Sequence, residues 1–137
     1  MLFRSVLLRW RHPVVGEIPP DVFINLAETQ QMIVPLTHHL LALIASDAAV
    51  LKRILPRGVK LGLNISPAHL QADSFRDDML RFAAALPADH FHVVLEVTES
   101  MSRRDAISLR MALTILKLVM GRDGGIIIPY LQYWYVI

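Results

Sequence analysis

The sequence predicts an α/β fold with a largely parallel sheet, because segments typical of strands alternate with segments typical of helices along the chain. Its 137 residues are enough for one hydrophobic core and too few for two. Polar residues also stand at the ends of two apolar, strand-like runs, which is where parallel α/β proteins build their sites. We therefore expect one α/β domain with a site at one edge of its sheet.

The N-terminal part predicts one strand, one loop and two helices. Residues 2–10 form an apolar run typical of a buried strand. The prolines and the glycine that follow predict a loop up to Pro20, which suits the first position of a helix. Apolar residues recur at helical spacing over residues 20–29 and again over residues 35–55, where Pro56 ends the pattern.

The remainder of the chain predicts two further strand and helix pairs. Residues 59–66 are typical of a strand, and a helix should begin with Asp73 as its cap and end before Pro87. A strand should then begin at about Phe91. Ser102, together with Asp105, resembles a capping box at the start of a helix that continues to residue 120. Residues 124–137 predict a last strand and an apolar, aromatic tail.

The amino-acid composition indicates an excess of apolar surface and excludes cysteine-based chemistry. Hydrophobic residues make up 54% of the chain and charged residues 19%, against a usual charged share of about a quarter. The chain therefore has more apolar surface than a small domain easily buries. It contains no cysteine, which excludes disulfides, thiolate metal sites and a cysteine nucleophile.

The charge and hydropathy patterns speak against nucleic acid and membrane as partners. The net charge of +2 is spread along the chain and forms no basic stripe, so we expect no DNA binding. The most apolar segment, residues 34–55, is interrupted by histidines and by charged residues such as Asp47 and Lys52. We therefore expect no membrane span and a cytoplasmic location.

Asn64 and Glu96 are the candidate site residues, because each stands at the C-terminal end of a predicted strand. An amide oxygen and a carboxylate on neighbouring strands are hard ligands that suit Mg²⁺, Mn²⁺ or Ca²⁺. The pattern leaves open the commoner alternative, in which both side chains cap loops or bind backbone amides.

The histidine pairs carry a weaker signal. His90 and His92 would share one face of a strand, as a zinc pair could, but they lie at its start and no third ligand is spaced to join them. His38 and His39 point to different sides of a helix. We interpret both pairs as structural or surface residues.

Asp77 and Asp78 form the one adjacent pair of carboxylates in a predicted helix. They fall in its first turns, where negative charge is favourable beside the helix dipole. We interpret them as structural rather than catalytic.

Three segments resemble a known family. "SVLLRWRHPVVGEIPPDVFINLAE", "LGLNISPAHL" and "LEVTES" are similar, in order and in spacing, to three motifs of the EAL domain, the bacterial phosphodiesterase family specific for cyclic di-GMP. The resemblance covers about residues 5–100. The first motif includes a "PxxFI…AE" element at Pro20, Phe23, Ile24, Ala27 and Glu28.

The resemblance implies a fold, an activity and roles for four residues. Family members resemble a TIM barrel with one irregular strand, and they hydrolyse cyclic di-GMP to linear pGpG with two Mg²⁺ or Mn²⁺ ions. By resemblance, Asn64 and Glu96 match metal ligands and Arg9 matches a residue that contacts the phosphate. Glu99 matches the second acidic residue of the "ExTE" motif and is the candidate catalytic residue.

The departures from the family pattern concern the metal ligands. Ser5 stands where the family has its name-giving glutamate, and a neutral hydroxyl is a poorer ligand for a hard dication. Pro129 and Tyr130 stand where the family has metal-binding aspartates. The family's later lysine, glutamate and glutamine motifs have no counterpart in this sequence.

The resemblance therefore implies a partial barrel. A TIM-like (β/α) barrel needs about 200 residues or more, so residues 1–137 should form a single truncated EAL-like domain, about half of a barrel, with a divergent tail over 124–137. An open half barrel would expose strand edges and the inward face of its sheet. The apolar excess fits this expectation, and self-association is the expected remedy.

Three functions follow as hypotheses. The first is a catalytically inactive domain of cyclic di-GMP signalling that acts through protein contacts or weak nucleotide binding. The second is an active phosphodiesterase whose site is completed by a second chain. The third is a fragment without a function of its own.

Overall fold

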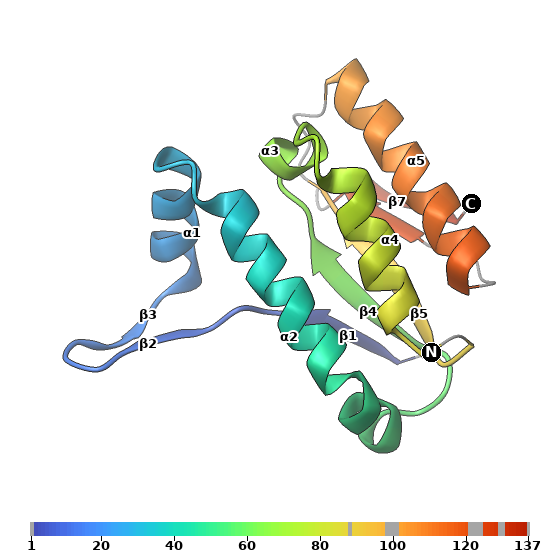
Figure 1. Ribbon diagram of the computed structural model, residues 1–137, viewed down its shortest axis with the longest axis horizontal. Helices are drawn as coiled ribbons and strands as arrows, with labels where there is room; N and C mark the ends of the chain where they lie inside the picture. The colour runs from blue at the N-terminus through green and yellow to red at the C-terminus, as the bar shows by residue number, and fades with distance from the viewer. Residues whose placement is uncertain (1, 88, 98–101, 121–124, 129–130, 137) are drawn as a thin grey trace.

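The computed structural model describes residues 2–87, 89–97, 102–120, 125–128 and 131–136. A five-stranded sheet with the order β1-β4-β5-β6-β7 forms its centre (Figure 1). The first four strands pair in parallel and β7 pairs antiparallel with β6. The strands are β1 (Phe3–Val6), β4 (Val59–Asn64), β5 (Phe91–Glu96), β6 (Gly125–Ile128) and β7 (Leu131–Val136).

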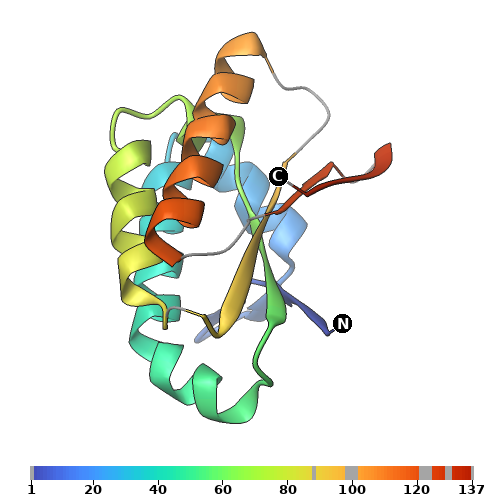
Figure 2. The same ribbon diagram turned by 90° about the vertical axis from the view of Figure 1, so that its right-hand side faces the viewer.

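Each parallel strand is added beside its predecessor, and the long helices cover one face of the sheet, as Figure 2 shows. These helices are α2 (Ile33–Ile54), α4 (Phe75–Ala85) and α5 (Arg103–Met120). Strands added in one direction, with right-handed crossovers, keep their helices on one side, which is the arrangement in a (β/α) barrel. The predicted α/β fold is confirmed, and its topology is that of a partial TIM-like barrel.

The core lies between the helices and the covered face of the sheet. Residues alternate along β4 and β5, so every second side chain points to the helices. These side chains and their helical partners are nearly free of solvent contact. The cluster includes Leu61, Leu63, Val93, Leu95, Leu41, Ile44, Met79, Phe82, Leu109 and Ala112.

The structure corrects the prediction for residues 2–20. The single predicted strand over residues 2–10 is two strands, β1 and β2 (Trp10–His12), and the predicted loop contains β3 (Gly16–Ile18), which pairs antiparallel with β2. The turn between them is held by His12, whose Nδ1 accepts hydrogen bonds from the backbone N–H of Val14 (3.1 Å) and of Val15 (3.3 Å). Gly16 has φ +79°, which glycine adopts without strain.

The helices agree with the sequence more closely than the loops do. Helix α1 (Pro20–Thr29) has the predicted bounds, and α2 begins two residues earlier than predicted. The short helix α3 (Pro67–Leu70) was not predicted. It begins immediately after Ser66, whose Oγ accepts a hydrogen bond from the N–H of His69 (3.2 Å), with Pro67 at the first helical position.

Two predicted helix caps have different outcomes. Ser102 and Asp105 form a reciprocal pair, in which the N–H of Ser102 donates to Oδ2 of Asp105 (3.0 Å) and the N–H of Asp105 donates to Oγ of Ser102 (3.1 Å). This confirms the predicted capping box of α5. The cap position of α4 is Ser74 rather than Asp73, and its side chain makes no capping hydrogen bond.

Helix α2 is long and apolar enough to cross a membrane by length and composition. It instead contributes Leu41, Ile44 and Ala48 to the core cluster beside the sheet. Core helices of globular domains meet the same criterion, so the helix is weak evidence for a membrane span.

Among the residues whose exposure the structure describes, several large exposed apolar side chains lie away from the sheet. The β2–β3 hairpin and α1 extend beyond it, at the left of Figure 1. Exposed apolar residues gather on this hairpin and on the neighbouring ends of α1 and α2. They include Trp10, Val14, Val15, Leu26 and Met32. The expectation that the inward face of the sheet also exposes apolar surface stays a prediction.

Candidate functional site

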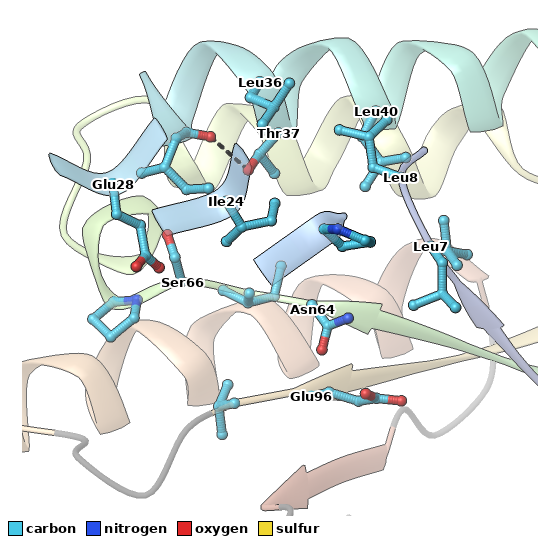
Figure 3. Close-up of a pocket in the computed structure, with 16 residues that line it drawn as sticks. Leu7, Leu8, Ile24, Glu28, Leu36, Thr37, Leu40, Asn64, Ser66 and Glu96 are labelled. Carbon is cyan, nitrogen blue, oxygen red and sulfur yellow. Dashed lines mark hydrogen bonds between the residues drawn. The ribbon is translucent and has the colours of Figure 1, made fainter. Parts of the chain in front are cut away.

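A pocket of about 290 Å³ lies at the carboxyl ends of β1, β4 and β5, next to α1 and α2 (Figure 3). Most of its lining is aliphatic. Figure 3 shows Asn64 and Glu96 at one end and Glu28 near Ser66 at the other. Thr37 also lines the pocket, and its hydroxyl donates to the carbonyl of Ile33 (2.7 Å).

Asn64 and Glu96 are brought together by the register of the sheet. They are direct partners in the parallel ladder between β4 and β5, so about 4.8 Å separates their backbones. The backbone N–H of Ile65 donates to the carbonyl of Glu96 (2.9 Å), which extends the pairing beyond the strands. The predicted juxtaposition of these two side chains at the carboxyl edge is therefore present in the structure.

Gly62 makes room for the Glu96 carboxylate. A Cβ atom at position 62 would collide with Oε1 of Glu96 and would lie 2.6 Å from Cζ of Phe3. Such contacts are closer than real side chains tolerate, so a larger residue would displace one of these groups. The glutamate thus leans back over β4, on the sheet face opposite to the core.

The pKa of the Glu96 carboxyl is raised. Burial raises its pKa above the ordinary value because the charged form loses hydration. A group in this state favours a proton or a neighbouring cation more strongly than an exposed carboxylate does.

Pro20, Ile24 and Glu28 of the first motif line the pocket, whereas Ser5 and Arg9 do not. Ser5 is the register partner of Gly62, so strand alternation places it on the same sheet face as Asn64 and Glu96, although it does not line the pocket. Arg9 is exposed and lines an apolar groove beside Trp10 and Phe23. Glu99, Pro129 and Tyr130 lie outside the described residues.

A second polar cluster, His38–His69–Asp78, lies outside this pocket. Both histidines direct Nε2–H at Oδ2 of Asp78, over 2.6 Å from His38 and over 2.9 Å from His69. The guanidinium of Arg81 donates to the other carboxylate oxygen (3.3 Å), and the hydroxyl of Ser74 is 3.3 Å from Nε2 of His38. His38 therefore has a hydrogen-bonded structural role, one of the two roles that the sequence interpretation allowed.

The protonation of this cluster follows from its burial. Burial lowers the pKa of His69, and this effect outweighs the opposing hydrogen bond to Asp78, so the imidazole is neutral at pH 7. Burial raises the pKa of Asp78, but the hydrogen bonds from His69, Ser74 and His38 outweigh it, and the net pKa is lowered. The cluster thus holds an ionised carboxylate between two histidines.

The sequence contains no spacing motif that identifies this cluster. His38 and Asp78 are 40 positions apart, and His69 lies on the helix that was not predicted. His90, in contrast, has the structural role assigned to it, since its Nε2–H donates to the carbonyl of Leu55 (2.9 Å).

Comparison with known families and proteins gives consistent matches. Residues 1–119 match the family described as the EAL domain. The chain is 64% identical over 95 residues to the probable cyclic di-GMP phosphodiesterase PdeN of Escherichia coli K12, and 39% identical over 95 residues to the cyclic di-GMP phosphodiesterase PdeL of the same organism. Each match covers 69% of this chain, but only 18% of PdeN and 26% of PdeL.

A solved structure agrees with the same relation. The structure titled "PaMucR Phosphodiesterase, c-di-GMP complex" matches with a TM-score of 0.68 and 29% identity. The match covers 97% of this chain and 53% of the chain in that structure, so this chain spans about half of the length of the solved one.

Proposed function

The chain belongs to the EAL domain family, and on this premise we propose that it is a cyclic di-GMP signalling domain without phosphodiesterase activity of its own. It acts through protein contacts or weak nucleotide binding, in the cytoplasm. The observation that carries the proposal is Ser5, which stands beside Gly62 on the face that holds Asn64 and Glu96. A hydroxyl there replaces the carboxylate that the family resemblance implies.

The donor set does not fit two divalent metal ions. At the carboxyl edge of this face the described residues offer one carboxylate, from Glu96, one amide oxygen, from Asn64, and the hydroxyl of Ser5. The carboxylate of Glu28 lies at the other end of the pocket, near Ser66 (Figure 3). Two Mg²⁺ or Mn²⁺ ions carry four positive charges and need several carboxylates to hold them close together. The sequence places Pro129 and Tyr130 where further aspartates would stand.

Nucleotide binding has partial support from the pocket. Its aliphatic lining and the amide of Asn64 could contact part of a nucleotide. Arg9, the expected phosphate contact, lies in the neighbouring groove rather than in this pocket. A ligand held without its metal ions and its phosphate contact should bind weakly.

Activity is tested with cyclic di-GMP and Mn²⁺, with E. coli PdeL as the positive control. We expect no turnover by this chain, by Glu96→Gln or by Ser5→Glu, because one added carboxylate leaves the site incomplete. Turnover that disappears in Glu96→Gln would overturn the proposal. A specific rate that rises with protein concentration would identify a site completed by a second chain.

Calorimetric titration with cyclic di-GMP, with and without Mn²⁺, tests the binding part. Weak binding that does not depend on the metal is the expected result. Tight, metal-dependent binding that Glu96→Gln abolishes would show that the metal site is functional.

A further inference from the structure

We propose that His38, His69 and Asp78 form a binding site for one zinc ion or a similar divalent transition metal, separate from the pocket at the sheet edge. The ligand atoms are Nε2 of both histidines and Oδ2 of Asp78. The three side chains come from α2, α3 and α4. This inference does not depend on the proposed function.

The ligand atoms already converge on one point. All three lie within 4.8 Å of one another. Zinc binds nitrogen and oxygen at about 2.0–2.2 Å, so two ligands of a tetrahedral ion lie about 3.3 Å apart. The distances from Asp78 Oδ2 are 2.6 Å and 2.9 Å, so these two pairs would open by about 0.7 Å and 0.4 Å. The two Nε2 atoms lie within 4.8 Å of each other and would adopt the same spacing. Each imidazole would bind the ion through Nε2 as its Nδ1–H tautomer, so the proton now directed at the shared oxygen would be carried on Nδ1.

The donor chemistry favours zinc over magnesium. Two imidazoles and one carboxylate are the ligands of zinc, cobalt, nickel and copper ions, whereas Mg²⁺ prefers an all-oxygen shell. Asp78 is held in place by Arg81, which binds its other oxygen while remaining 78% exposed. Such an outer contact orients a ligating carboxylate.

The cluster is closed on one side and open on the other. The side chain of His69 is fully buried and that of Asp78 is 5% exposed, whereas that of His38 is 42% exposed. Beside His38 and Asp78 runs a groove between α2 and α4, lined by Leu41, Ala45 and Phe82 among others. Solvent and a fourth ligand can therefore reach the ion from this side, which is the pattern of three protein ligands with one open position.

A bound ion would fasten three helices together. It would also fix α3, whose capping residue Ser66 lines the pocket beside Asn64. Metal binding should therefore raise the thermal stability of the folded chain, because the ion binds the assembled cluster and not the unfolded chain.

The test uses the chain without a histidine tag, freed of metal and titrated with ZnCl₂ by calorimetry, and with Co²⁺ as a spectroscopic probe. We expect one ion per chain, the visible absorption of tetrahedral Co²⁺, and a higher Tm with Zn²⁺. His38→Ala should lower the affinity by more than the roughly 10- to 100-fold that loss of an outer-shell partner costs.

The matched control is His39→Ala, which removes the adjacent exposed histidine that lines a different groove. It should bind Zn²⁺ like the parent chain, and so should Glu96→Gln. Asp78 is buried, so Asp78→Asn could fail to fold, whereas His38 is partly exposed and His38→Ala should fold. Circular dichroism checks that His38→Ala is folded. Absence of stoichiometric binding, or equal affinity in His38→Ala and His39→Ala, would overturn the proposal.

Discussion

Gly62 is the residue on which the geometry of the sheet-edge site depends most directly. Its missing side chain leaves the space that Glu96 Oε1 and the ring of Phe3 occupy. The sequence shows a glycine within an apolar strand, but the close approach that requires it comes from residues on two other strands. Local propensity would disfavour glycine here, so the requirement is tertiary.

Gly62→Ala should destabilise the fold by on the order of 1–3 kcal/mol, because overpacking forces Glu96 or Phe3 to move. The free energy of unfolding from denaturant titration measures this loss. Adding Gly62→Ala to Glu96→Ala should cost less than adding it to the parent chain, since one crowding group is gone. Equal stability of Gly62→Ala and the parent chain would contradict this account of the site.

At the scale of elements, the start of α5 shows how far a local pattern predicts structure. The reciprocal hydrogen bonds of Ser102 and Asp105 follow from their spacing, because a capping side chain accepts a hydrogen bond from the N–H group three positions later. The sequence does not reveal that Gln71 also donates to Oδ1 of Asp105 (3.0 Å), because this contact joins residues 34 positions apart. Tertiary packing thus adds to a locally encoded cap.

These bonds predict an acid-sensitive contribution to stability. The hydrogen bond from the backbone of Ser102, followed by that from Gln71, lowers the pKa of Asp105 below its ordinary 3.8, against the opposing effect of burial. A carboxyl with a lowered pKa in the folded state stabilises the fold at pH values above its unfolded pKa. This contribution is lost as pH falls from there through the lower folded pKa.

The measurement is the free energy of unfolding from pH 7 down to pH 2 for the parent chain and for Asp105→Asn. The variant should be less stable at pH 7, and the difference should shrink as the pH falls below about 4. Asp77→Asn, at an exposed position in the first turn of α4, is the control. A difference between parent and Asp105→Asn that is constant over this pH range would contradict the assignment.

The remaining elements differ in how far the sequence encodes them. Helix α1 was predicted with its observed bounds, because Pro20 and the helical spacing of apolar residues are local signals. The β2–β3 hairpin was missed because its prolines and valines resemble a loop, and its turn depends on the side chain of His12. The four-residue helix α3 is too short to produce a periodic pattern.

At the scale of the whole molecule, the exposed apolar residues are the feature most relevant to association. Trp10, Leu26 and Met32 line one groove with the buried ring of Phe23, and the rings of Trp10 and Phe23 meet edge to face at 6.1 Å. The hairpin and α1, which contribute Trp10 and Leu26 to this groove, lie at one end of the molecule (Figure 1). Contiguous apolar surface of this kind favours contact with another protein surface.

We predict that the chain self-associates through this groove. Leu26→Lys places a charge in it and should shift the chain towards monomer, whereas Ile107→Lys replaces an exposed apolar residue of α5 and should have little effect. Light scattering over a range of protein concentrations gives the oligomeric state of both variants and the parent. A parent chain that is monomeric throughout, or an equal response of the two variants, would contradict the prediction.

The sequence by itself determined the alternation of strands and helices and the placement of Asn64 and Glu96 at strand ends, and its family resemblance predicts the loss of a carboxylate at Ser5. These properties depend on local periodicity and on motifs that can be recognised within a short stretch of sequence. The tertiary structure decided which distant residues meet: it crowds Glu96 against Gly62, places Arg9 in a separate groove and gathers His38, His69 and Asp78 on one side of the sheet. The physical reason is that such contacts depend on how helices pack on a common sheet, and this packing leaves no periodic signal in the chain.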